Sequence, residues 1–428
     1  MTRRVRKTRL RIKWKALITL IVACILVVFV VTNGIRMISD AFKTDPNAFK
    51  TCGLSNKKLI DKLNDKEYDG YIEAKDYIFY GENLSFYSDE YSLGTGNSFI
   101  GKTMILKNVC NDKEITIEKI GVELDGQIHL GEIPPGLYEV YIVENLITKR
   151  LYTTSKVIEN TNFYTVTRNG SNNKVDIIAD KSFLNNVDTK ENTDVLARNY
   201  IFLNIEKSEL PAEVYDIAIN PGTISAEYTT GKVVGDLNEI EEMYRLAEKI
   251  KTELEKSGLK VIITGENNAW TNLYGETGML GKGYSANVKY GLNLSMANAD
   301  ASSSGMSVIY SAYVSDAFGK EIFNTVSAGT NLKGRNREYD VLESELEGIY
   351  DVDYDIREGG GKALAAGTLT GSSSQMNAFA KNLKGMNIIF VQVFNAANTS
   401  DVEVWSTDFE NIATKYAEGI KNYLGIQK

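Results

Sequence analysis

Polar side chains that could bind a ligand or transfer a proton follow three apolar runs in the second half of the chain. These segments are AINPGTIS (218–225), LSMANAD (294–300) and FVQVFNAANTSD (390–401). Each apolar run has the length and composition of a buried strand. In sheets built from alternating strands and helices, ligands bind at the carboxyl ends of the strands. We therefore expect a cleft lined by Asn298, Asp300 and Asn398.

Several kinds of catalytic centre are excluded by residue type. The chain contains a single histidine, His129, which lies far from these segments in the sequence. A Ser-His-Asp triad and a zinc site with two His ligands both need imidazoles close to the other catalytic groups. The acidic run at 338–360 lacks the fixed Asp/Asn/Gly spacing of a calcium-binding loop, so we interpret it as a solvated insertion.

Alternating strands and helices must position the three segments. Apolar runs predict strands over 214–219, 260–264, 292–297, 306–312 and 387–394. Apolar periodicity predicts helices over 237–256, 315–327 and 406–423. Asp236 is the expected N-cap of the first helix and forms a capping box with Glu239, and Gly258 follows its end. The pattern predicts an α/β domain over 212–428, with a mostly parallel sheet and helices on both faces.

A β-rich domain is expected upstream, over residues 76–183. Short alternating runs occur at 115–124 and 136–146, and the tract at 169–174 is typical of a hairpin tip. The Pro-Pro-Gly turn that leads into the second run resembles extracellular β-sandwich modules of the immunoglobulin-like or transthyretin-like kind. Residues 184–211 are expected to form the linker to the α/β domain.

The N-terminus has the pattern of a membrane anchor. Residues 1–15 hold eight Lys or Arg and no acidic residue, and residues 16–35 carry no charge. Twenty residues in a helix just cross a hydrocarbon core of about 30 Å, and the basic flank places the N-terminus in the cytoplasm. A cleaved signal peptide is the alternative, although no small-x-small cleavage site follows the apolar run. Polar residues 36–75 then predict a juxtamembrane spacer.

Net charge and cysteine content argue against one class of binding partner and against a framework of several disulfides. Removing the eight basic charges of the tail from the formal net charge of -8 leaves -16, which argues against a nucleic-acid partner. Cys24 lies in the apolar run, so only Cys52 and Cys110 remain outside it. Two cysteines are too few for a disulfide framework, and we expect them to be unpaired, with one bridge as the alternative.

The three strand ends resemble, in order and spacing, the catalytic domain of the zinc-dependent N-acetylmuramoyl-L-alanine amidases of family 3. That family cuts the bond between muramic acid and the stem peptide of peptidoglycan. The likeness covers 213–428 and is strongest over NEIEEMYRLAEKIKTELEKSGLKVIITGEN (238–267), NLSMANADASSSGMSVIY (293–310) and IATKYAEGIKNYLGI (412–426). In the family, two His and a Glu hold zinc, and a Glu on a late strand is the general base.

Carried over by position, the zinc ligands fall on Thr223, Glu239 and Met296, and the base falls on Gln392. Only Glu239 keeps its residue type. A Met thioether is a weak ligand for zinc, Thr offers a neutral hydroxyl, and Gln cannot accept a proton at neutral pH. The resemblance therefore implies that zinc and hydrolysis are lost and that no cofactor is bound. Glu239 then serves as part of the capping box, and Met296 is an apolar filler.

The expected protein is a single-pass membrane protein with its C-terminal domains outside the cytoplasm. Its amidase-like domain would bind peptidoglycan or an envelope protein partner as a scaffold. One alternative is an active amidase with an atypical metal site that uses Glu239, Asp300 or Glu266. Another is a receptor or adhesion subunit in which the domain at 76–183 binds and the α/β domain is a spacer.

Overall fold

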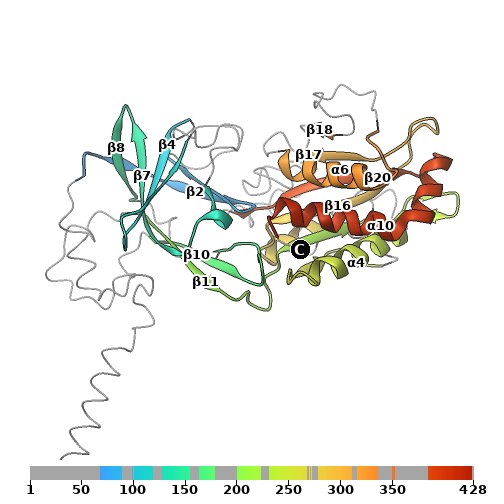
Figure 1. The fold of residues 1–428 in the computed structure, drawn as a ribbon, viewed down its shortest axis with the longest axis horizontal. Helices are drawn as coiled ribbons and strands as arrows, with labels where there is room; N and C mark the ends of the chain where they lie inside the picture. Colours follow the sequence, from blue (N-terminus) through green and yellow to red (C-terminus); the bar gives the residue numbers. More distant parts are fainter. Residues whose placement is uncertain are drawn as a thin grey trace, which may run out of the picture.

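A computed structural model gives the fold of the chain (Figure 1). It describes residues 68–88, 99, 101–118, 128–154, 163–178, 200–222, 231–267, 269, 271, 278–310, 316–335, 349–351 and 384–426. The expected membrane helix at 16–35 lies outside these residues, as does Thr223. Within the part of the chain that is described, no helix is long and apolar enough to span a membrane.

The N-terminal half consists of two β-sheets. The larger sheet has the order β1-β8-β7-β11-β10-β9, with β4 pairing to β7 and β5 to β4. Its strands are β1 (Tyr71–Glu73), β4 (Thr103–Asn108), β5 (Glu114–Ile117), β7 (Gly136–Glu144), β8 (Ile147–Tyr152), β9 (Phe163–Tyr164), β10 (Asn172–Ile178) and β11 (Phe202–Ser208). The smaller sheet has the order β19-β2-β3-β6. Its strands are β2 (Asp76–Tyr80), β3 (Asn83–Tyr87), β6 (Ile128–His129) and β19 (Lys384–Gly385), and a short 3-10 helix, η1 (Leu130–Glu132), follows β6.

One apolar core lies between these two sheets. Along β4, buried and half-buried residues alternate, as the two-residue period of a strand requires. Met104 and Leu106 of β4 are fully buried and join the same core as Phe79 and Phe86 of the smaller sheet. Removing each such side chain from water stabilises the fold by about 1.5–3 kcal/mol.

The β domain extends further along the chain than the sequence pattern predicts. Strand β11 pairs with both β10 and β7, so residues 202–208 of the expected linker form a central strand. Strand β1 also begins before the expected boundary at residue 76. Cys110 is disulfide-bonded, contrary to our expectation, and its partner lies outside the described residues.

The C-terminal half contains a six-stranded sheet in the order β15-β12-β16-β20-β17-β18. Its strands are β12 (Ile217–Pro221), β15 (Val261–Ile263), β16 (Tyr290–Ala297), β17 (Ser307–Tyr310), β18 (Ile349–Asp351) and β20 (Asn387–Asn395). Neighbouring strands are parallel except for β17 and β20, which makes the sheet mixed. The five expected strands are present, whereas β18 forms inside the acidic run that was expected to be a solvated insertion.

Three long helices cover one face of this sheet (Figure 1). They are α4 (Glu239–Glu255), α6 (Ala317–Gly329) and α10 (Thr399–Tyr423). On α4 the buried residues recur every three or four positions, so one stripe faces the sheet. The short helix α5 (Met279–Ser285) lies on the other face, where Gly283 packs against Ala218. A two-stranded antiparallel ribbon, formed by β13 (Val233–Val234) and β14 (Leu237–Asn238), precedes α4.

Candidate functional site

Glu239 is the first residue of α4 and is fully buried. The N-cap of this helix is Asn238, whose side chain accepts hydrogen bonds from the backbone N–H groups of Ile240 and Glu241. The expected capping box with Asp236 is therefore wrong, because the helix starts later than predicted. Because Asn238 caps the helix, the Glu239 carboxylate is available for another contact. It accepts a hydrogen bond of 2.9 Å from the backbone N–H of Met296, near the end of β16.

Lys232 supplies a positive charge at the same place. The β13–β14 ribbon folds back on α4, so the Glu239 N–H donates to the Lys232 carbonyl at 2.8 Å. The Lys232 ammonium donates to the Met296 carbonyl at 3.0 Å and lies 3.7 Å from Glu239 Oε1. Glu239 thus holds one polar group of the Met296 backbone and Lys232 holds the other. The sequence pattern did not single out Lys232, since it belongs to no motif.

Burial dominates the electrostatics of Glu239. Loss of solvent raises the pKa of its carboxyl, while the Lys232 charge and the hydrogen bond from Met296 act in the opposite direction. Glu239 Oε2 is buried and has no hydrogen-bond partner among the residues that the structure describes. An unpaired buried carboxylate oxygen destabilises the fold by about 1–3 kcal/mol, so protonation of Glu239 is favoured by its surroundings.

Met296 is a core residue. Its side chain is fully buried, in the cluster that includes Phe394 and Trp405. The rings of Phe394 and Trp405 stack with centroids 4.7 Å apart. A thioether enclosed by this cluster fills apolar space, which fits the interpretation of Met296 as a filler.

Gln392, at the position of the base, is bound by a guanidinium. It lies on β20 in register with Ser295 of β16 and Ser307 of β17. Its side-chain oxygen accepts a hydrogen bond from Arg335, which is almost completely buried. The Gln392 amide oxygen thus accepts from a cation, and the amide has no basic group to take a proton from water.

The three residues expected to line a cleft belong to one loop system. Asn298 and Asp300 are exposed after β16. Hydrogen bonds from Ser302 lower the pKa of the Asp300 carboxyl. Asn398 is the N-cap of α10, accepting from the Asp401 N–H at 3.0 Å, and its amide donates to the Ala301 carbonyl at 2.8 Å. Asn398 therefore ties this loop to α10.

Two further buried residues organise the loop after β16. The Asn395 side chain accepts from the Ala299 N–H and donates to the carbonyls of Asp300 and Ser303. The Asp401 carboxylate accepts from the Asn395 N–H at 2.9 Å, and also from Ser304 and Gly305. These contacts are structural. The sequence showed both residues after the last strand but gave no sign of their partners.

The residues around Glu239 do not fit a zinc ion. Zinc in a hydrolase takes three or four His, Cys, Asp or Glu ligands. Within the part of the chain that the structure describes, no group of three or more such side chains gathers. The Lys232 ammonium lies 3.7 Å from Glu239 Oε1, and its charge repels a divalent cation. Asp300 and Glu266, the other carboxylates of the alternative metal site, are exposed to solvent.

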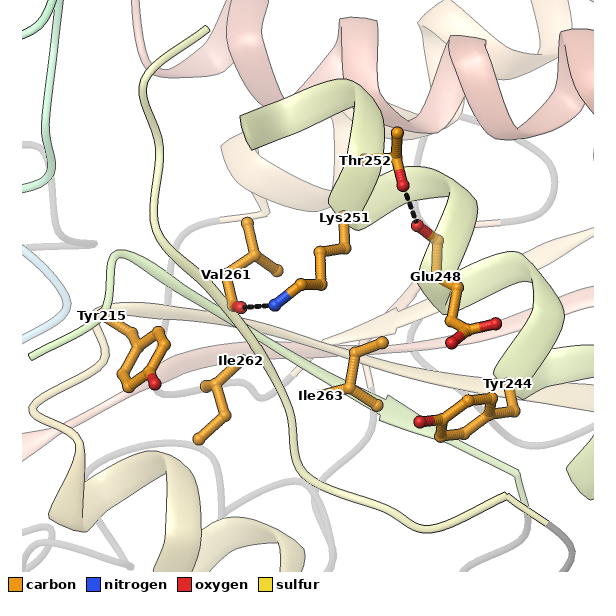
Figure 2. A pocket seen from close by; sticks show the side chains of 8 residues that line it. All are labelled: Tyr215, Tyr244, Glu248, Lys251, Thr252, Val261, Ile262 and Ile263. Atoms are coloured by element: carbon orange, nitrogen blue, oxygen red, sulfur yellow. Dashed lines mark hydrogen bonds between the residues drawn. The ribbon is translucent and has the colours of Figure 1, made fainter. Parts of the chain in front are cut away.

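A cavity with a volume of about 370 Å³ lies away from these residues (Figure 2). It runs along the edge strand β15 and is flanked by α4. Tyr215 and Tyr244 stand at its two ends, and the Lys251 ammonium crosses it to the Val261 carbonyl at 2.7 Å. None of the residues predicted to form a site contributes to its walls.

Comparisons with known proteins give distant likenesses. No protein-family model matches the chain, and no curated protein matches it. Among solved structures, the N-acetylmuramoyl-L-alanine amidase AmiC2 of Nostoc punctiforme is 16% identical, with 50% of this chain and 99% of that chain covered and a TM-score of 0.35. The catalytic domain of the amidase CwlV from Bacillus (Paenibacillus) polymyxa var. colistinus is 14% identical, over 50% and 99%, with a TM-score of 0.37. A putative amidase of the same kind from Neisseria meningitidis is 16% identical, over 50% and 98%, with a TM-score of 0.31.

Proposed function

We propose that this chain is a membrane-anchored, extracytoplasmic pseudo-amidase. It binds peptidoglycan or scaffolds an envelope complex, without zinc and without hydrolysis. The resemblance of its strand ends to family 3 amidases motivates the choice of peptidoglycan. The observation that carries the loss of catalysis is the position of the Lys232 ammonium, 3.7 Å from Glu239 Oε1 and bonded to the Met296 carbonyl.

The physical argument concerns charge. A metal hydrolase needs a cation with an open position for water and a nearby base. Here the only carboxylate left at the inferred ligand positions is enclosed, with a backbone N–H and an ammonium as its neighbours. The inferred base position holds Gln392, which is engaged by Arg335. This constellation can hold a loop and a helix end in place, and it lacks the groups that would activate water.

Sedimentation with purified sacculi tests the binding half of the proposal. We expect the full chain in mild detergent to co-sediment with sacculi saturably. Asn298→Arg, an exposed change in the loop after Met296, should weaken this binding at least tenfold. Ser406→Arg, on the exposed face of α10, is the matched control and should bind as the unchanged chain does. If no variant binds sacculi above background, the wall-binding function is wrong.

The alternative function, an active amidase with an atypical metal site, predicts a different result in the same sedimentation experiment. An amidase would release stem peptides from the sacculi during the incubation. We expect none, measured by mass spectrometry of the supernatant, with an active amidase of family 3 as the positive control. Release of stem peptides by the purified chain would favour the atypical-metal enzyme.

A further inference from the structure

An ion pair between a partly exposed arginine and a buried glutamate lies where the β domain meets the α/β domain. Glu82, in the turn between β2 and β3, is fully buried. Arg168, in the turn before β10, donates from both terminal nitrogens to the two Glu82 carboxylate oxygens. The Val166 N–H adds a hydrogen bond of 2.6 Å to the same carboxylate. All these groups belong to the β domain, and they form one charged, fully hydrogen-bonded cluster.

The cluster also binds the α/β domain. Arg168 Nε donates to the carbonyl of Leu424, just beyond α10, at 2.6 Å. The hydroxyl of Tyr290, the first residue of β16, lies 3.4 Å from Glu82 Oε2. The Tyr290 ring in turn packs against Phe318 of α6 and Tyr423 of α10. One ion pair therefore contacts a central strand and the C-terminal helix of the neighbouring domain.

Two further connections join the domains beside the Glu82–Arg168 ion pair. The Asp216 carboxylate accepts from the Thr167 N–H of the β domain at 2.8 Å and from the Lys260 N–H of the α/β domain at 2.7 Å. Strand β19 pairs in parallel with β2 of the smaller sheet, and the chain then continues into β20 in the centre of the six-stranded sheet. The same stretch of chain thus takes part in both domains.

The packing at this boundary is continuous. Val166 of the β domain belongs to the apolar core of the α/β domain. The Lys289 ammonium lies over the Phe163 ring, 4.2 Å from its centroid. Gly131 leaves space for Arg168, since a Cβ there would lie 1.8 Å from Nη1. Domains joined only by a linker move relative to each other by default, whereas these two domains share hydrogen bonds, a core residue and a strand pairing.

We infer that the β domain and the α/β domain fold and move as one rigid unit, in which Glu82 and Arg168 are positioning residues. The loop after Met296 is then held at a fixed orientation relative to the β domain. This inference does not depend on the proposed function, because it concerns only how the two halves are joined.

Hydrogen exchange in increasing urea tests the inference on the full chain in detergent. Peptides from β7 and β16 report on the two domains separately. We expect the most protected amides of both to open at one urea midpoint in the unchanged chain. Glu82→Gln leaves the partly exposed Arg168 charge without its partner and should lower both midpoints equally, with a fall in melting temperature of roughly 5 °C.

Matched variants distinguish loss of the contacts around Glu82 and Arg168 from a general loss of stability. Lys107→Met removes an exposed ion pair with Glu114 inside the β domain and should move neither midpoint. Tyr290→Phe removes a hydroxyl that contacts both Glu82 and Tyr423 and keeps the ring, so it remains usable if Glu82→Gln does not fold, and it should lower both midpoints together. Two distinct midpoints in the unchanged chain, or a variant that shifts β7 alone, would overturn the inference.

Discussion

The Glu239 carboxyl is enclosed by protein, and its proton equilibrium follows from that enclosure. Burial raises its pKa, so the folded chain binds this proton more tightly than the unfolded chain does. The associated stability is fully present below the unfolded pKa of Glu and is lost as pH rises through the folded pKa. Relative to Glu239→Gln, the unchanged chain should therefore lose stability as pH rises above about 4, the ordinary pKa of Glu.

Urea unfolding at several pH values checks this prediction. Glu239→Gln keeps an oxygen that can accept from the Met296 N–H, so the fold should survive. Glu241→Gln is the control, because it makes the same change at an exposed position of the first turn of α4. If the difference in unfolding free energy between Glu239→Gln and the unchanged chain stayed constant with pH, the Glu239 carboxyl would not be buried as described.

The Met296 side chain should behave as core. Met296→Ala should lower the free energy of unfolding by about 2–5 kcal/mol, and Met296→Leu by less than about 1.5 kcal/mol. Chemical denaturation measures both. A cost below about 1 kcal/mol for the alanine variant would mean that the side chain does not fill the space between β16 and α10.

Residue type alone settled part of the candidate site. With a single histidine in the chain, a metal site with two histidine ligands from this chain is excluded. The partner of Glu239 was not, because Lys232 reaches it only through the β13–β14 ribbon. The error over Asp236 has the same origin: Asp and Asn both make good N-caps, and tertiary contacts selected Asn238.

Helix α10 begins at Thr399, well before the expected start at residue 406. Residues 398–401 (NTSD) do not by themselves predict a helix, since Asn, Ser and Asp favour turns as readily as helix starts. Strand β11 was missed for a related reason, because Asn204 and Glu206 interrupt its apolar alternation. Strand β20 was predictable because its residues Ile388–Val391 form an unbroken apolar run, which is typical of strands buried on both faces.

The Asn398 cap of α10 can be tested directly. Asn398→Ala removes an acceptor for the Asp401 N–H and the donor to Ala301, and should cost about 1 kcal/mol of unfolding free energy. Ser406→Ala, on the exposed side of the same helix, should stay within about 0.5 kcal/mol of zero. Equal costs for the two variants would show that the cap does not stabilise α10.

The join between the halves lay beyond sequence patterns. Arg168 and the Leu424 carbonyl are 256 positions apart, and no sequence pattern pairs them. Removing the β domain leaves β19 without β2 and Asp216 without Thr167. We expect a chain that begins at residue 212 to melt at a lower temperature than the full chain, by circular dichroism. Equal melting temperatures would mean that the α/β domain is independent.

Zinc content measured together with stem-peptide release tests the central claim most directly. The purified full chain, and the variant with Thr223→His, Met296→His, Gln392→Glu and Lys232→Ala, are each dialysed against excess zinc and analysed by mass spectrometry. The account predicts less than about 0.1 zinc per unchanged chain and no stem peptide released from sacculi. One zinc per unchanged chain, accompanied by release of free stem peptide, would contradict it.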